Sequence, residues 1–169
     1  MKKKILALDQ AMQKTGWAVF QGKSLIASGT FSIKPTLPID QRLTSIMQHL
    51  SELYNEYEFS KVVYEDIQLQ CGNVTTYQRL AYVQAAILIW CYSNDVRNEC
   101  LAPSHWRKVL KDNFGVAFGK KREDQKQAAI DFVKQQFKIE VNTDEADGIC
   151  IGFASQVERP TEASTESAF

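Results

Sequence analysis

Two short apolar segments, each ending in a carboxylate, constrain this chain more than any other feature. Residues 4–9 read Lys-Ile-Leu-Ala-Leu-Asp, and residues 61–65 read Lys-Val-Val-Tyr-Glu. A short continuous apolar run predicts a strand that is covered on both faces, because a strand with one wet face alternates apolar and polar residues. If the two strands are parallel neighbours, Asp9 and Glu65 emerge at the sheet edge where open α/β sheets bind ligands.

The remaining segments predict an α/β fold. Residues 17–20 and 25–31 predict an antiparallel hairpin, and a 3.6-residue apolar period predicts a helix over residues 39–57. We expect further helices over 73–92, 103–111 and 122–137, a strand over 96–101, and a last helix starting near Thr143, with its hydroxyl as the N-cap. This order predicts a mixed sheet of about five strands with helices on both faces.

Composition bounds the domain count and the compartment. With 169 residues, 44% of them apolar, the chain fits one domain, which we place at residues 1–157. Residues 158–169 are rich in Pro, Thr, Ser and Glu, which predicts a disordered tail. No stretch resembles a signal peptide or a membrane helix, and Cys91 and Cys150 have the apolar neighbours of buried free thiols. We therefore expect a cytoplasmic protein.

Two further acids favour a metal site. Asp144 and Asp147 are spaced i, i+3 at a predicted helix start, so they share one helix face. Together with Asp9 and Glu65 they make four carboxylates without a Lys or Arg beside them in sequence, which would repel one another unless a divalent cation bound. Oxygen ligands favour Mg²⁺, for which Mn²⁺ can substitute. Two ions about 3.5 to 4 Å apart can catalyse phosphodiester hydrolysis.

Each acid taken singly also has an ordinary explanation. Asp144 lies in Asn142-Thr-Asp-Glu, which is typical of a helix start without any ligand. A surface role explains Asp9 less well, because that residue directly follows four apolar residues. We leave Glu145 and Asp66 out of the predicted cluster because helix and strand geometry point them away from it.

Positive charge is concentrated in one part of a chain that has no net charge. Between Pro103 and Lys138 there are nine Lys or Arg residues against four Asp or Glu residues, a surplus of five. The densest point is Lys120, Lys121 and Arg122, after a glycine and at a predicted helix start. Such a surplus is what contact with a DNA backbone requires, although a solvated basic turn has the same composition.

Three segments resemble the RuvC family of Holliday junction resolvases. Residues 7–9 and 15–19, Ala-Leu-Asp and Thr-Gly-Trp-Ala-Val, are similar to the family's opening strand and hairpin. Residues 62–65, Val-Val-Tyr-Glu, resemble its second acidic strand, and residues 144–149, Asp-Glu-Ala-Asp-Gly-Ile, resemble its terminal helix. The resemblance runs in order from residue 5 to about residue 154.

The resemblance implies an RNase H-like fold and a homodimer whose two active sites cut opposed strands of a four-way DNA junction. It implies that the metal ligands are Asp9, Glu65, Asp144 and Asp147. It also implies that the basic residues before the last helix, Lys120, Lys121 and Arg122, contact the junction backbone.

One segment departs from the family pattern. Cellular members place an aromatic wedge a few residues after the second acid, where this chain has Ile67, Gln68, Leu69 and Gln70. We therefore expect little sequence specificity and activity on other branched DNA, including forks and flaps. The lysine-rich loop and residues 72–77 look more like phage-encoded members of the family.

Three alternatives share parts of this pattern. A non-catalytic binder of branched DNA could keep the fold, although it has no reason to gather carboxylates near phosphate. A ribonuclease H would instead cleave RNA–DNA hybrids. Actin-like ATPases and sugar kinases share the strand, acid and hairpin opening, but this chain lacks their glycine-rich phosphate turns and their second lobe.

Overall fold

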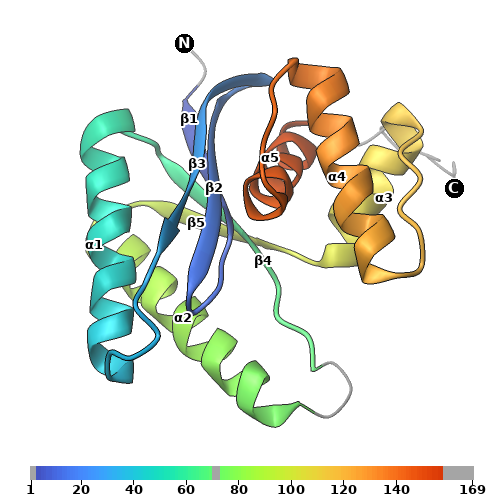
Figure 1. The fold of residues 1–169 in the computed structure, drawn as a ribbon. Coiled ribbons are helices and arrows are strands. Elements are labelled where there is room, and N and C mark those ends of the chain that lie inside the picture. Colours follow the sequence, from blue (N-terminus) through green and yellow to red (C-terminus); the bar gives the residue numbers. More distant parts are fainter. Residues whose placement is uncertain (1–2, 70–72, 158–169) are drawn as a thin grey trace, which may run out of the picture.

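The computed structural model describes residues 3–69 and 73–157, which form five strands and five helices (Figure 1). The strands are β1 (Lys4–Asp9), β2 (Lys14–Gln21), β3 (Ser24–Ser32), β4 (Lys61–Glu65) and β5 (Arg97–Leu101). The helices are α1 (Ile39–Tyr57), α2 (Val74–Ser93), α3 (Pro103–Phe114), α4 (Arg122–Phe137) and α5 (Thr143–Gln156). The expected mixed α/β fold is confirmed, while the tail predicted over 158–169 lies outside the described residues.

The five strands form one mixed sheet in the order β3-β2-β1-β4-β5. Strands β1, β2 and β3 pair antiparallel, as the predicted hairpin required, and β1, β4 and β5 pair parallel. The register places Leu8 opposite Tyr64, so β1 and β4 end side by side. The parallel neighbours expected from the two acidic segments are therefore confirmed.

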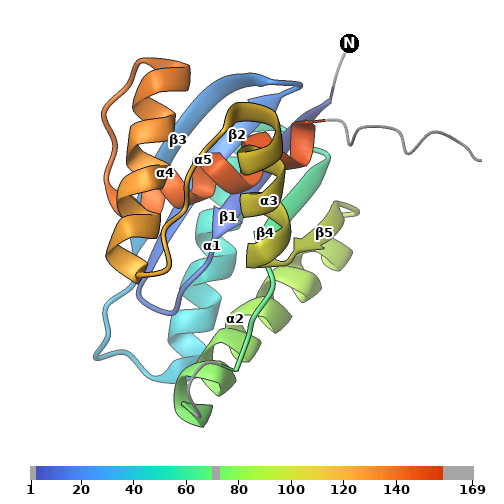
Figure 2. The same cartoon turned by 90° about the vertical axis from the view of Figure 1, so that its right-hand side faces the viewer.

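Helices cover both faces of the sheet. Figures 1 and 2 show α1 and α2 on one face and α3, α4 and α5 on the other. Successive side chains of a strand point to opposite faces, and β1 follows this rule: Leu6 and Leu8 are buried with α1 and α2, while Ile5 and Ala7 are buried with α5. By the same alternation Asp9 projects toward α5. The sheet thus has a mainly apolar face and a face that carries an acid at its edge.

Helix starts agree with the sequence in one case and correct it in another. Helix α3 begins at Pro103, whose missing N–H costs nothing in the first turn. The expectation that Thr143 caps α5 is wrong. The side chain of Asn142 accepts the hydrogen bond from the backbone N–H of Glu145 at 3.0 Å, so Thr143 is the first helical residue.

Two further sequence expectations concern the cysteines and the possibility of a membrane helix. Cys91 and Cys150 are free and fully buried, as their apolar neighbours indicated, and Cys100 is free and exposed. Over the described ranges, no helix combines the length and the apolar character that crossing a membrane would take.

Candidate active site

Strand alternation brings the two strand-end acids to the same face. In β4, Val62 and Tyr64 are buried with α1 and α2, whereas Val63 belongs to the core under α5. Glu65 therefore projects on the α5 side, as Asp9 does from the end of the neighbouring strand. These are two of the four acids predicted from the sequence.

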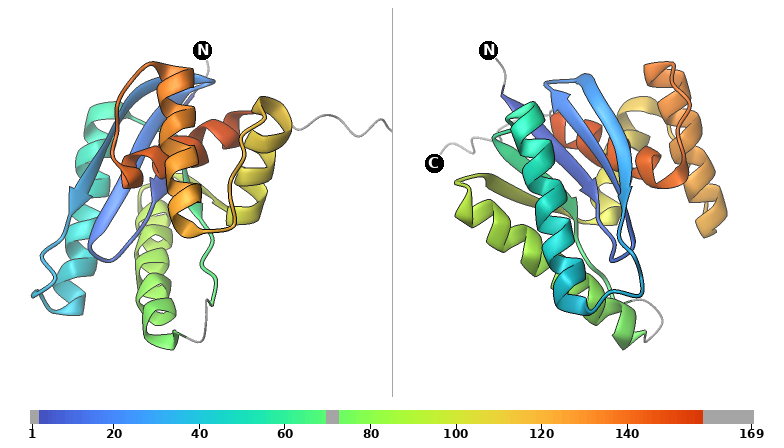
Figure 3. Two further views of the ribbon diagram at one scale, coloured as in Figure 1. Left: turned by 45° about the vertical axis from the view of Figure 1, so that its right-hand side comes forward. Right: turned by 60° about the vertical axis from the view of Figure 1, so that its left-hand side comes forward.

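Two glycines let the first turn of α5 touch the sheet. A Cβ atom on Gly16 would lie 1.8 Å from the backbone oxygen of Asp144, and a Cβ on Gly148 would lie 3.0 Å from the backbone carbon of Gly16. No larger residue fits at this contact without moving the helix. Because Gly16 pairs with Asp9 in the sheet, the start of α5 is placed beside β1. Figure 3 shows α5 lying against the strands.

The electrostatics show that the four acids lie within reach of one another. Partial burial raises the pKa of Asp9 well above its usual value, and the charges of Asp147, Glu65 and Asp144 raise it further, in that order. Burial likewise raises the pKa of Asp147 to about 6. Burial raises the pKa of Glu65 as well. The structure therefore concentrates negative charge where β1, β4 and α5 meet.

Two lysines contact the acids from other elements. Lys14 of β2 has its Nζ atom 3.5 Å from Oδ2 of Asp144, and Lys126 of α4 has its Nζ atom 3.9 Å from Oδ2 of Asp147. Sequence reasoning had assigned the acids no basic neighbours and missed both contacts. A signal for Lys126 existed, because it follows Arg122 by four residues and so shares its helix face.

Arg107 of α3 is a third cation at the site. Its guanidinium group lowers the pKa of Glu65 and of Asp147, which places it near both carboxylates. Its Nε atom is buried and has no hydrogen-bond partner among the described residues. The side chain also covers the ring of Trp106, with Cζ 4.9 Å from the ring centroid. Neither residue was singled out from the sequence.

The two acids left out of the predicted cluster do point elsewhere. Glu145 accepts a hydrogen bond at Oε1 from the hydroxyl of Ser28 in β3, at 2.7 Å. Asp66 accepts one from the backbone N–H of Ile67, and its charge acts on Cys100 and on Tyr64, which belongs to the core under α1 and α2.

The predicted DNA contacts lie on the surface beside this site. Lys120, Lys121 and Arg122 are all exposed, in the loop before α4 and at its first residue. Within residues 3–69 and 73–157, none of the three forms a salt bridge. Lys126, one helical turn after Arg122, links this basic segment to the acids.

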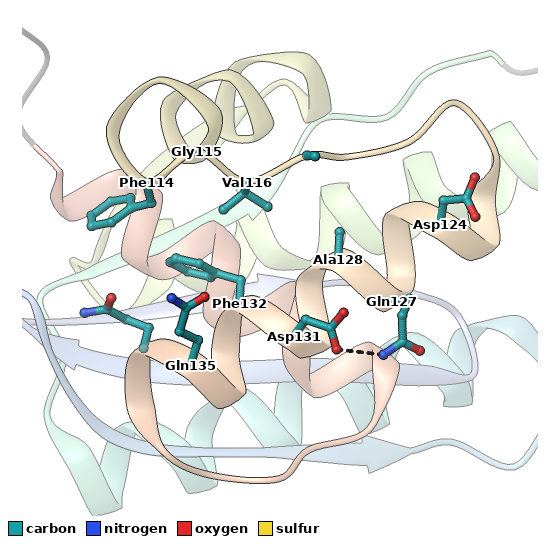
Figure 4. A pocket seen from close by; sticks show the side chains of 11 residues that line it. Phe114, Gly115, Val116, Asp124, Gln127, Ala128, Asp131, Phe132 and Gln135 are labelled. Atoms are coloured by element: carbon teal, nitrogen blue, oxygen red, sulfur yellow. Dashed lines mark hydrogen bonds between the residues drawn. The ribbon is translucent and has the colours of Figure 1, made fainter.

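A hollow on the same side of the molecule is separate from the acids. It lies between the end of α3 and α4, and Figure 4 shows Phe114, Val116, Ala128 and Phe132 in its lining. Of its two acids, Asp124 and Asp131, Asp131 accepts a hydrogen bond from Nε2 of Gln127 at 2.8 Å. The lining includes none of the four predicted ligands.

The donor set suits a hard divalent cation. Across the part of the chain that the structure describes, no three His, Cys, Asp or Glu side chains are placed to hold one ion as they stand. Their chemistry nevertheless fits: besides burial, the charges of Asp147, Glu65 and Asp144 each raise the pKa of Asp9 more than Lys126 lowers it. Oxygen donors with uncompensated negative charge are what Mg²⁺ and Mn²⁺ bind.

Comparison with known proteins gives consistent matches along the chain. The model of the family described as "Crossover junction endodeoxyribonuclease RuvC" matches residues 5–154. The RuvC protein of Rickettsia akari (strain Hartford) is 27% identical over 161 residues, which cover 92% of this chain and 98% of that protein. The RuvC protein of Rickettsia prowazekii (strain Madrid E) is 27% identical over 159 residues, which cover 90% of this chain and 96% of that protein. These relatives are bacterial, so the phage-encoded type remains a prediction.

Solved structures with the same fold are resolvases. Thermus thermophilus RuvC in complex with a Holliday junction substrate superposes with a TM-score of 0.70 at 13% identity, covering 90% of this chain and 91% of that one. Fowlpox virus resolvase, in complex with Holliday junction DNA, superposes with a TM-score of 0.59 at 13% identity, covering 90% of this chain and 96% of that one. These likenesses establish the RNase H-like fold, and the match to the family model over residues 5–154 establishes that the chain belongs to the RuvC family of crossover junction endodeoxyribonucleases.

Proposed function

We propose that this chain is a metal-dependent endonuclease that cleaves Holliday junctions and other branched DNA. The observation that carries the proposal is the meeting of four acids from β1, β4 and α5 at one sheet edge, where burial raises the pKa of Asp9 well above its usual value and the charges of Asp147, Glu65 and Asp144 raise it further. A fold stabilised only for DNA binding would gain nothing from this repulsion. Membership of a nuclease family supports the same conclusion.

The four acids are the proposed metal ligands: Asp9, Glu65, Asp144 and Asp147. These carboxylates would hold two Mg²⁺ ions per active site, or Mn²⁺ in their place, which would supply Lewis acidity for phosphodiester hydrolysis. Lys126 and Arg107 lie beside the same carboxylates, so they can pair with the phosphate that enters the site. The buried, unpartnered Nε of Arg107 is a donor that such a phosphate can satisfy.

The proposed contacts with the DNA backbone are Lys120, Lys121 and Arg122. Their exposure, and the lack of ion pairs with other described residues, leave them available to phosphates. Gln68 and Leu69 are exposed after β4, and Leu69 is 59% exposed, at the positions where an aromatic wedge was expected. Without an aromatic side chain to stack on bases at these two positions, we propose little sequence specificity. The proposed site of action is the cytoplasm.

We further propose that the chain acts as a homodimer joined through α2. The outer side of this helix exposes Leu88, Ile89 and Tyr92, which are 39%, 58% and 90% exposed. Large apolar side chains gathered on one helix favour a protein partner, and a second copy would present the same residues. Sedimentation should give a dimer for the wild type and a monomer for Ile89→Glu. A monomeric wild type would contradict this part of the proposal.

A panel of substrates tests the proposed activity. Four-way junctions, forks, flaps, linear duplex and RNA–DNA hybrids are incubated with the protein in Mg²⁺, Mn²⁺ or chelator. We expect cleavage of the branched DNA in either metal and none in chelator. Binding to junctions without cleavage in any metal would favour the non-catalytic reading, and preferential cleavage of hybrids would favour a ribonuclease H.

A further inference from the structure

Glu65 is held from more sides than any of the other three acids. On one edge it pairs with Leu101 of β5. On the other edge, the backbone pairing between β1 and β4 ends at Leu8 and Tyr64. The side chain of Gln10 then takes the place of the next backbone partner of Glu65. Nε2 of Gln10 donates to the carbonyl of Glu65 at 2.5 Å, and Oε1 of Gln10 accepts from the N–H of Glu65 at 3.1 Å. The backbone of Glu65 is therefore fixed on both edges.

The carboxylate of Glu65 is fixed as well, by Trp106 of α3. The indole Nε1 donates to Oε2 of Glu65 at 2.6 Å. Trp106 is 1% exposed, and its ring meets Phe118 edge to face, with centroids 5.5 Å apart, while Arg107 covers it. A ring enclosed in this way cannot turn without repacking its neighbours.

The chemistry of indole gives this bond a directional consequence. Indole has one donor and no acceptor, so Trp106 can bind only an oxygen of Glu65 and stabilises the charged carboxylate. Its hydrogen bond lowers the pKa of Glu65 against the raising effect of burial. With Oε2 occupied, Oε1 is the oxygen of Glu65 left for a further partner.

We propose that Trp106 is a positioning residue for the metal site, which holds the carboxylate of Glu65 in one orientation so that Oε1 is presented to the divalent ion. This inference rests on the proposed function, because it requires Glu65 to be a ligand. Removing a hydrogen bond that orients a metal ligand typically weakens metal binding by about 10- to 100-fold. We expect about a 10-fold loss for Trp106→Phe, which keeps an aromatic ring but has no donor.

The chain offers a matched control in Trp90. Trp90 is 2% exposed, and its Nε1 donates to the hydroxyl of Ser51 at 2.9 Å. Trp90→Phe therefore also deletes one buried indole hydrogen bond, but on the α1 and α2 side of the sheet, away from the acids. Both variants should lose comparable thermal stability, while only Trp106→Phe should lose metal affinity.

The first measurement is Mn²⁺ binding to the DNA-free protein, followed by electron paramagnetic resonance of the free ion. Wild type, Trp106→Phe, Trp90→Phe and Asp9→Asn are compared. We expect weak binding by Asp9→Asn, about 10-fold weaker binding by Trp106→Phe than by wild type, and wild-type binding by Trp90→Phe. Junction cleavage by Trp106→Phe should need about 10-fold more Mg²⁺ and return to the wild-type rate at saturation.

A second measurement needs no change at Trp106, so it holds even if that variant does not fold. The three Trp residues of the wild type give three indole signals in a proton–nitrogen correlation spectrum, and Trp17→Phe and Trp90→Phe assign them by elimination. Titration with Mg²⁺ should shift the Trp106 signal and leave the Trp90 signal in place.

The outcomes separate the two proposals. If wild-type protein and Asp9→Asn bind Mn²⁺ equally, the proposed metal site is wrong, and the role of Trp106 falls with it. If binding depends on Asp9 but Trp106→Phe binds as tightly as Trp90→Phe, or the Trp106 signal does not move, only the positioning role is contradicted.

Discussion

The two faces of the sheet are built from the same strands but bury different chemistry. Under α1 and α2 the side chains of Leu6, Leu8, Val62 and Tyr64 form an apolar core with the helices. Under α3, α4 and α5 the strands also bury apolar residues, and β1 and β4 end in acids whose pKa values burial raises. Both faces bury an apolar core, but only the second also carries the electrostatic cost of buried acids. The difference teaches that the proposed site lies where burial of charge opposes folding.

Leu8 and Asp9 are adjacent in β1 and point to opposite faces, so we expect their substitutions to differ most in effect. Asp9→Asn should reduce cleavage of a four-way junction by at least about 1000-fold, because it removes a proposed metal ligand. It should raise the thermal stability of the metal-free protein, because it removes a charge that the fold disfavours. Leu8→Ala should instead cost about 2 to 5 kcal/mol of stability. Cleavage assays and thermal melts check both, and wild-type cutting by Asp9→Asn would remove the distinction between the faces.

The contact between α5 and β2 gives the next largest effect. Gly16→Ala would place a methyl group against the backbone of Asp144, so we expect it to cost about 3 kcal/mol of stability and to impair cleavage. Gly115→Ala is the control, since no atom lies within 4 Å of its Cβ position and only its positive φ of 69° is unfavourable. It should cost about 1 kcal/mol and leave cleavage intact. Equal effects on cleavage would mean that this contact does not position the acids.

The stability of the metal-free protein should depend on pH through the acidic face. An acid whose pKa is higher in the folded than in the unfolded protein contributes stability at low pH that is lost as pH rises through the folded pKa. For Asp147 that loss occurs between about pH 4 and pH 6, the value to which burial raises its pKa. From Asp147 alone, we expect unfolding at pH 8 to need about 1.4 kcal/mol less than at pH 5.

Denaturant titrations of three proteins sharpen this prediction. Asp147→Asn should lose the part of the pH dependence between pH 5 and 8 that Asp147 contributes, and the raised pKa of Asp9 should leave a remainder. Leu8→Ala should keep the full dependence at lower overall stability. Adding Mg²⁺ at pH 8 should return the stability of the wild-type protein to its value at pH 5. A pH dependence that is unchanged in Asp147→Asn would show that the buried acid is not its source.

The smallest expected effects lie on the surface beside the acidic face. Lys120→Ala, Lys121→Ala and Arg122→Ala should each weaken junction binding and reduce the slope of log affinity against log salt by about 0.9. Lys23→Ala is the control, because Lys23 is exposed in the hairpin turn at the other end of β2. Fluorescence anisotropy at several salt concentrations measures the slopes. A slope change for Lys23→Ala equal to the others would indicate general attraction rather than a defined contact.

The acids could be brought together from the sequence because each step was local. A continuous apolar run predicted each buried strand, and the i, i+3 spacing placed Asp144 and Asp147 on one helix face. The structure confirms the parallel pairing of β1 and β4 that this reasoning needed. Residues two apart in a strand point to the same face, so Asp9 points to the same face as Ala7.

The neighbours of the acids could not be predicted, because their contacts are set by packing between elements. Lys14 and Arg107 reach the acids from β2 and α3, and no sequence spacing marks either position. Only Lys126 carried a signal, its spacing of four residues from Arg122. Trp106 reads as an ordinary apolar position of a short helix, yet its N–H reaches Glu65. Thr143 and Asn142 are both common caps, so only the geometry of the turn distinguishes them.

The most direct test of the central claim is a crystal structure of the protein grown with Mn²⁺, with data collected to locate manganese by its anomalous scattering. The account predicts anomalous density at the edge of the sheet, bounded by Asp9, Glu65, Asp144 and Asp147, with Lys126 displaced from Asp147. Ordered manganese elsewhere on the molecule, with the four carboxylates unliganded, would contradict it.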